Sequence, residues 1–290
     1  MQEGPIIVQA TKCNEYDYTM MSTYMTCQRK YWFRMVKGLV PKRVSTAPEF
    51  GRCIHKALDE WYKSQEIDKA VKVFIDAFVP NLDDDMRTHV LGEWILRNYA
   101  EKYQDQGFEI EMTEMEFSVK LPNGNKLIGR MDKIIDWDGA FWVMDHKTTS
   151  GLTSNYMKMH TPNLQFDGYT YAARKLGYNV QGVLVDAILV AKGLLDSTRR
   201  RNLTPLLRDF AYRDDEALAR YERQVMRIQG DIELKSDEES YLPNFDACTY
   251  YGECPYRRIC IEPREVWERV EAIEYKPELW HPHTKEEVIK

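Results

Sequence analysis

The chain has 290 residues, enough for one large domain or two modest ones, and 43% of them are hydrophobic, as in a globular protein with a buried core. The formal net charge of −6 argues against a protein that coats nucleic acid without regard to sequence. No segment approaches the ~18 uncharged apolar residues that a membrane-spanning helix needs, and the N-terminus has no long apolar run, so we expect a cytoplasmic protein with no secretory leader and no membrane contact.

The first 105 residues are predicted to be mainly helical. In one segment, Ile54, Leu58 and Trp61 follow the i, i+4, i+7 spacing of a buried helix face. A second helix is expected around 67–78 and a third within 86–104, where apolar residues recur at the same spacing. The N-terminal third is therefore expected to supply helices that cover a core.

The pattern changes after residue 105. Residues 107–147 are rich in β-forming residues, and the turn signals Asn123-Gly124 and Asp138-Gly139 divide them into a predicted three-strand antiparallel meander. The later elements alternate in type: a helix at 163–177, strands at 180–192 and 205–213, a long charged helix at 214–235 and a short helix at 264–274. This order predicts an α/β fold with a central mixed β-sheet flanked by helices.

We expect a single domain over residues 1–290. Its parts are a mainly helical N-terminal part at 1–105, an α/β core at 106–215, a helix and cysteine-rich segment at 216–265, and a C-terminal tail at 266–290.

A pair of carboxylates is the main chemical signal. If the hairpin turn uses Asp138-Gly139, Trp137 faces Ala140 across the two strands. In the same register Asp132 stands directly opposite Asp145. Opposed residues in a hairpin have Cβ atoms roughly 4.5–5.5 Å apart, and like charges there are destabilising. A positive group is therefore expected between the two carboxylates.

A hard divalent cation such as Mg²⁺ or Mn²⁺ suits a site of carboxylate and carbonyl oxygens. Lys147 lies two residues beyond Asp145, so the strand period of two places both side chains on one face, where Arg130 would oppose Lys147. A metal there can polarise a phosphodiester, and Lys147 can orient or deprotonate the attacking water or stabilise the phosphate charge. The alternative is an ordinary exposed hairpin with solvated Asp and Lys side chains.

Four blocks of the sequence, in order, resemble the PD-(D/E)XK nuclease superfamily, in particular its RecB-like and Cas4-like branch. They are GRCIHKALDEWY with His55, GRMDKIID with Asp132, VMDHKTTS with Asp145 and Lys147, and QFDGYTYA with Gln165 and Tyr169. The resemblance covers roughly residues 20 to 265. It implies a restriction-endonuclease-like core.

The resemblance also implies roles for these residues. The metal would be bound by the side chains of His55, Asp132 and Asp145 and by the backbone carbonyl of His146. Lys147 would be the catalytic lysine. Gln165 and Tyr169, one helical turn apart on the same face, would help to position the metal, the lysine or the DNA strand. The nearby Asp59, Asp136 and Asp167 are interpreted as solvated residues or as residues that contact the metal ligands without binding the metal themselves.

The six cysteines do not resemble a disulfide framework, and three of them lie within thirteen residues near the end of the chain. The same branch often carries a [4Fe–4S] cluster held by one cysteine before the nuclease core and three after it, which implies the ligands Cys27, Cys248, Cys254 and Cys260. The usual late spacing is C-x2-C-x5-C, whereas both gaps here are five residues. Cys13 is therefore an alternative to Cys248.

Two other interpretations of the late cysteines stay open. Zinc could replace the cluster, or the thiols could be metal-free core residues. Cys53, inside the predicted helix of His55, is expected to be a core residue.

The function expected from the sequence is a metal-dependent DNA nuclease. By resemblance, it would be an exonuclease that acts on DNA ends or single strands in recombination, repair, phage DNA processing or CRISPR adaptation. Its partners would be DNA and a helicase, a recombinase or a CRISPR adaptation protein. The alternatives are a non-catalytic DNA-binding or scaffold subunit with the same fold and an iron–sulfur redox sensor, neither of which needs the Asp/Lys site.

Overall fold

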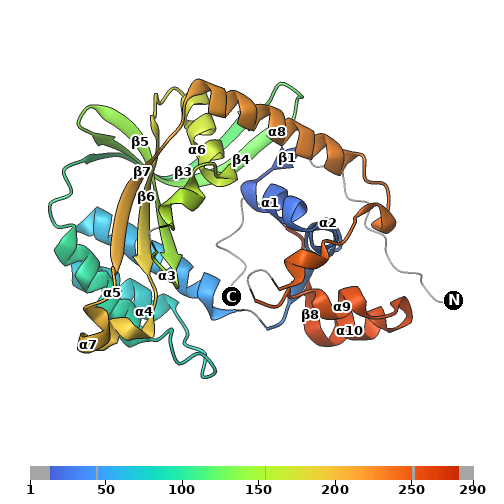
Figure 1. Ribbon diagram of the computed structural model, residues 1–290, viewed down its shortest axis with the longest axis horizontal. Helices are drawn as coiled ribbons and strands as arrows, with labels where there is room; N and C mark the ends of the chain where they lie inside the picture. The colour runs from blue at the N-terminus through green and yellow to red at the C-terminus, as the bar shows by residue number, and fades with distance from the viewer. Residues whose placement is uncertain (1–13, 44, 154, 250–251, 281–290) are drawn as a thin grey trace. The chain divides into compact units, whose positions relative to one another are not determined.

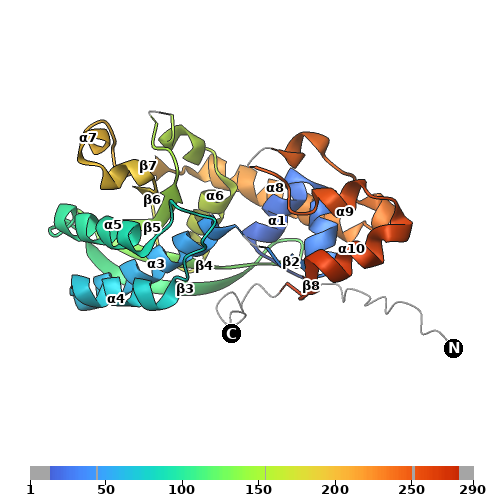
Figure 2. The same ribbon diagram turned by 90° about the horizontal axis from the view of Figure 1, so that it is seen from below.

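The computed structural model describes residues 14–43, 45–153, 155–249 and 252–280 (Figures 1 and 2). The chain divides into two compact units, each built from separated segments. The larger unit contains Ser45–Glu116 and Arg130–Leu218, and the smaller unit contains Met1–Val44, Phe117–Gly129 and Ala219–Lys290. Within the described ranges, no helix is both long and apolar enough to cross a membrane.

The larger unit begins with three helices that pack on one another, α3 (Thr46–Ser64), α4 (Ile67–Ala77) and α5 (His89–Lys102). The predicted buried face of α3 is confirmed, since Ile54, Leu58 and Trp61 are all buried. α5 lies within the range 86–104 where a helix was predicted. The side chain of its N-cap residue, Thr88, accepts a hydrogen bond from the N–H of Leu91, so the helix begins at His89.

The sheet of the larger unit consists of β3 (Glu109–Lys120), β4 (Lys126–Trp137), β5 (Ala140–Thr149), β6 (Gly182–Leu189) and β7 (Leu206–Tyr212), with β3 and β4 continuing into the smaller unit. β5 is antiparallel to β4 and parallel to β6, and β6 is antiparallel to β7. The predicted α/β fold with a central mixed sheet flanked by helices is confirmed.

Helices cover both faces of this sheet. Successive residues of a strand point to opposite faces, so two neighbouring residues of β5 show which helix lies on each side. Thr148 of β5 packs against α3, where a Cβ atom built on Gly51 would lie 2.7 Å from the Thr148 hydroxyl. Lys147, the preceding residue, faces the other way, and its Nζ lies 5.4 Å from the ring centre of Phe166 in α6 (Leu164–Lys175). Figures 1 and 2 accordingly show α6 apart from the group of α3, α4 and α5.

Short elements link the main ones in the larger unit. These are the 3-10 turns η2 (Met157–His160) and η3 (Lys192–Leu195) and the single-turn helix α7 (Ser197–Arg200). α6 connects β5 to β6, as the crossover between two parallel strands requires.

The smaller unit joins the beginning of the chain to its end. Its elements are β1 (Glu15–Tyr16), α1 (Tyr18–Thr26), α2 (Gln28–Tyr31), η1 (Trp32–Val36), β2 (Leu39–Pro41), most of α8 (Asp215–Glu233), η4 (Glu238–Ser240), η5 (Phe245–Cys248), α9 (Arg257–Ile261), η6 (Arg264–Val266), α10 (Trp267–Glu274) and β8 (Tyr275–Pro277). β1 runs parallel to the start of β4, and β2 pairs antiparallel with β8. The rings of Phe33, Tyr256 and Tyr275 stack in series in the core of this unit.

Candidate functional site

The hairpin of β4 and β5 sets the geometry of the site. Asp138 and Gly139 both have positive φ angles, 52° and 79°, as a two-residue turn of type I′ requires. The register runs from Trp137 opposite Ala140 to Lys133 opposite Met144, as predicted. Asp132 and Asp145 are the next residues in that register, and their carboxylates lie close enough for their charges to interact.

One carboxylate oxygen of Asp132 contacts two polar partners. Its Oδ2 lies 3.2 Å from Nδ1 of His55 on α3, and it accepts a hydrogen bond of 3.1 Å from the backbone N–H of His146. Burial raises the pKa of the Asp132 carboxyl, but the charge and hydrogen bond of His55, together with the Lys133 charge, outweigh burial and hold that pKa well below its usual range. Asp132 is therefore ionised at neutral pH.

Asp145 is the more deeply buried carboxylate of the pair. Burial raises its pKa, the Lys147 ammonium lowers it, and the charge of Asp132 raises it further, so that the pKa stays above its ordinary value. Nζ of Lys147 lies 2.5 Å from Asp145 Oδ2, although this buried oxygen accepts no well-aligned hydrogen bond. A cationic group thus lies beside the opposed carboxylates, as their repulsion requires.

The structure brings together His55, Asp132, Asp145 and Lys147, all of which belong to the larger unit. Gln165 and Tyr169 lie on α6, whose N-cap Asn163 accepts hydrogen bonds from the N–H groups of Gln165 and Phe166. Nε2 of Gln165 donates to the Tyr169 hydroxyl at 2.8 Å, so the two predicted partners contact each other. α6 reaches the site through the Phe166 ring, which faces the Lys147 ammonium.

The sequence matches the model of one protein family. The model of the PD-(D/E)XK nuclease superfamily matches residues 18–261, most of the chain. The chain belongs to the PD-(D/E)XK nuclease superfamily.

Two solved structures are similar to this superfamily member. A candidate exonuclease from Eubacterium rectale is 14% identical, with a TM-score of 0.47 over 82% of this chain and 90% of that chain. The protein SSO0001 is 16% identical, with a TM-score of 0.35 over 73% of this chain and 84% of that chain. No curated protein matches the sequence.

PD-(D/E)XK nucleases typically use Mg²⁺ or Mn²⁺, so the residues of the site should be able to bind such an ion. Across the ranges that the structure describes, no three His, Cys, Asp or Glu side chains stand ready in a metal-binding arrangement. The chemistry of the donors fits nevertheless. Asp132 and Asp145 offer the hard oxygen ligands that these cations prefer, and the buried Oδ2 of Asp145, which lies 2.5 Å from the Lys147 ammonium, accepts no well-aligned hydrogen bond from the described residues.

The predicted cysteine quartet of this PD-(D/E)XK chain lies in the smaller unit. Burial raises the pKa of the Cys254 and Cys260 thiols, and the nearby Cys27 and Cys248 raise it further, so the four cysteines lie close together; all four are partly buried and free of disulfides. A backbone hydrogen bond of 2.8 Å, from the N–H of Cys254 to the carbonyl of Cys248, links two of them directly. Cys53 is buried in the core of the larger unit, as expected. The alternative ligand, Cys13, lies outside the described residues.

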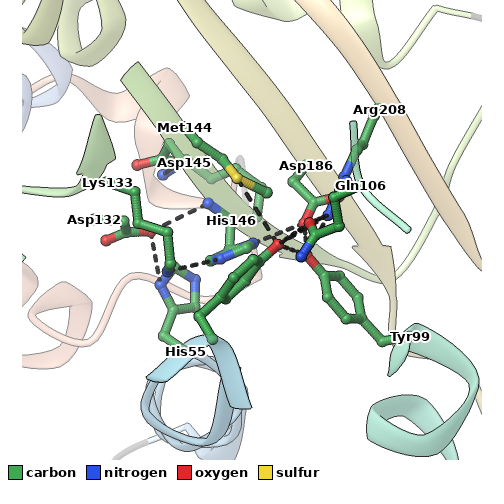
Figure 3. A network of polar contacts seen from close by, with 12 residues as sticks. His55, Tyr99, Gln106, Asp132, Lys133, Met144, Asp145, His146, Asp186 and Arg208 are labelled. Carbon is green, nitrogen blue, oxygen red and sulfur yellow. Dashed lines mark hydrogen bonds and ion pairs between the residues drawn. The ribbon is translucent and has the colours of Figure 1, made fainter. Parts of the chain in front are cut away.

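A buried polar network next to the site was not foreseen from the sequence (Figure 3). It joins Lys133, His146 and Asp186 to Arg208 and Tyr99. Burial and the Lys133 charge lower the pKa of His146 to about 4, so the His146 ring is neutral at pH 7. The available signal was Asp186 itself, the one charged residue in the apolar run GVLVDAIL, because a carboxylate in a buried strand requires partners.

Proposed function

We propose that this nuclease hydrolyses DNA phosphodiester bonds at Asp132, Asp145 and Lys147 with the aid of Mg²⁺ or Mn²⁺. The observation that supports the proposal is the pairing of two opposed carboxylates with a lysine on the same strand face, in a chain of a nuclease superfamily. A non-catalytic scaffold subunit would gain nothing from this pair of carboxylates, since opposed like charges destabilise a hairpin.

The ion would be held by His55, Asp132, Asp145 and the backbone carbonyl of His146. When bound, such an ion polarises the phosphate and lowers the pKa of a water molecule. Lys147 neutralises Asp145 in the structure described here. With that carboxylate shared with a cation, the Lys147 ammonium would be available to orient the attacking water and to stabilise the phosphate charge, whereas deprotonation of that water would need the neutral amine form of Lys147. Gln165 and Tyr169 would position the lysine or the DNA strand from α6.

The proposed mode is exonucleolytic, on DNA ends or single strands, and rests on the resemblance to the RecB-like and Cas4-like branch. The proposed settings are recombination, repair, phage DNA processing and CRISPR adaptation. The corresponding partners are DNA and a helicase, a recombinase or an adaptation protein.

A [4Fe–4S] cluster is proposed at Cys27, Cys248, Cys254 and Cys260. The gathering of four reduced thiols from both ends of the chain supports it, because thiolates are the usual ligands of such clusters. The cluster would tie the beginning of the chain to its end inside the smaller unit, where the stacked rings of Phe33, Tyr256 and Tyr275 already join them.

One assay tests the proposed reaction. Labelled single- and double-stranded DNA, each linear and circular, is incubated with the protein and Mn²⁺, and then with an excess of EDTA. We expect loss of linear substrate with Mn²⁺, little loss of circular substrate, and none of either with EDTA. Binding without cleavage under all conditions would favour the scaffold subunit, and a protein that neither binds nor cuts DNA would favour the redox sensor.

A further inference from the structure

Asp186 is a fully buried carboxylate in the middle of β6, where every residue is buried. Its Oδ2 accepts a hydrogen bond of 2.8 Å from Nδ1 of His146 and another from the Tyr99 hydroxyl, and its Oδ1 accepts one of 2.9 Å from Nε of Arg208 (Figure 3). An ionised carboxylate in the interior is costly unless it is paired and hydrogen-bonded. Asp186 meets that condition through partners from β5, α5 and β7.

These contacts fix the ring of His146. Nδ1 donates to Asp186, and Nε2 lies 3.2 Å from the Lys133 ammonium, which can donate to it. The neutral tautomer with its proton on Nδ1 is the one that satisfies both neighbours, an assignment made from the hydrogen-bond network. The ring also stacks on Tyr62, with centroids 5.7 Å apart and planes 29° apart. Any rotation of the ring would break both hydrogen bonds.

The backbone of His146 is part of the proposed cutting site. Its N–H donates to Oδ2 of Asp132 at 3.1 Å, the same oxygen that lies 3.2 Å from His55. Its peptide neighbours are Asp145 and Lys147, whose side chains lie on the opposite face of the strand from the buried ring. The His146 ring therefore anchors the segment of β5 that carries Asp145 and Lys147.

We propose that His146 is a positioning residue, held by Lys133, Asp186 and Arg208, that fixes the strand segment 145–147 so that Asp132, Asp145 and Lys147 are set for metal binding and cleavage. The inference rests on the proposed function, because the groups that it positions are the proposed ligands and lysine. The role belongs to the side chain of His146, in addition to its backbone carbonyl. Outer hydrogen bonds of this kind orient metal ligands in other proteins.

Two variants and one control separate positioning from packing. His146→Phe keeps an aromatic ring against Tyr62 and removes both hydrogen bonds. His146→Asn keeps a donor close to the place of Nδ1, and so can retain the link to Asp186. The control is Ile188→Val, a fully buried apolar position on the same strand as Asp186, which lowers stability without touching the polar network.

Mn²⁺ affinity is measured by calorimetry without DNA, and kcat and KM are measured on the DNA substrate. We expect His146→Phe to bind Mn²⁺ roughly 10–100-fold more weakly and to lose a similar factor in kcat, as is typical when a hydrogen bond behind a ligand is removed, with KM for DNA unchanged. His146→Asn should recover part of both losses, and Ile188→Val should match the parent. Parental Mn²⁺ affinity and kcat in His146→Phe would overturn the proposal.

A readout that needs no metal keeps this inference separate from the proposed function. Amide hydrogen exchange in segment 143–149 is compared in EDTA at conditions that give equal global stability. His146→Phe should exchange faster there than Ile188→Val. If the parent neither binds Mn²⁺ nor cuts DNA, the proposed function is wrong, and the exchange result alone decides the positioning role. Equal exchange in the two variants would then refute it.

Discussion

At the scale of single residues, Asp132 and Asp145 are a matched pair with opposite pKa shifts. The pKa of Asp132 is held low because His55 and Lys133 stabilise its charge against the effect of burial. The pKa of Asp145 is raised by burial, and Lys147 only partly offsets this. Of the two carboxylates, Asp145 is therefore the one whose ionisation mainly lowers the stability of the folded protein.

Asp145→Asn should stabilise the metal-free protein at neutral pH while removing cleavage and weakening Mn²⁺ binding. A carboxyl whose pKa is raised on folding lowers stability once the pH exceeds its ordinary pKa in the unfolded chain, so the gain should shrink as the pH falls below about 4. Thermal melts in EDTA at pH 7 and at pH 4 measure the change in Tm and so check this prediction. A lower Tm at pH 7 would show that Asp145 is not the strained member of the pair.

Lys147→Ala should keep Mn²⁺ binding and lose cleavage. Its ammonium lies on the Asp145 oxygen that the cation would share, so Mn²⁺ should bind as tightly as in the parent or more tightly. The rate should fall by ~10²-fold or more, the usual contribution of one such group. Single-turnover cleavage and calorimetry measure the two effects. Lys72→Ala removes an exposed lysine from α4 as the charge control, and cleavage by Lys147→Ala at the rate of that control would mean that the assigned site is wrong.

At the scale of elements, the hairpin was predictable and the network behind it was not. Asp138-Gly139 dictates a turn with two positive φ angles, and the turn fixes the register as far as Lys133 and Met144, so a local signal was sufficient. Asp186 depends on partners from α5 and β7 that are distant in the sequence. Their pairing follows from sheet order and helix packing, for which the chain offers no local signal.

The turn supports a matched prediction on two glycines. A Cβ atom on Gly139 or on Gly230 of α8 would meet nothing within 4 Å, so crowding is absent at both positions. Gly139→Ala should destabilise by roughly 1–2 kcal/mol, because φ is 79° there. Gly230→Ala lies within a helix and should stabilise by about 0.4–1 kcal/mol. Denaturant titrations of both variants measure these values, and a loss of stability in both would show that the backbone angle is not the cause.

At the scale of the whole molecule, the two proposed centres belong to different compact units. His55, Asp132, Asp145 and Lys147 are residues of the larger unit, and the cysteine quartet belongs to the smaller one. The family match over residues 18–261 includes both. Each centre should therefore survive the loss of the other's ligands.

Cys254→Ala should remove iron and the brown colour of protein purified without oxygen, and it should lower stability. A cross-link between Cys27 and Cys254 closes a loop through most of the chain, and loop-closure entropy puts its loss at about 5 kcal/mol. Mn²⁺ affinity should persist, because no ligand of that site changes. Cys53→Ala is the control, since Cys53 is a buried core thiol outside the quartet and its variant should keep its iron. Iron analysis, visible absorption and calorimetry together decide the matter. Stoichiometric zinc without iron in the parent would overturn the cluster assignment, and loss of Mn²⁺ binding in Cys254→Ala would show that the two centres depend on each other.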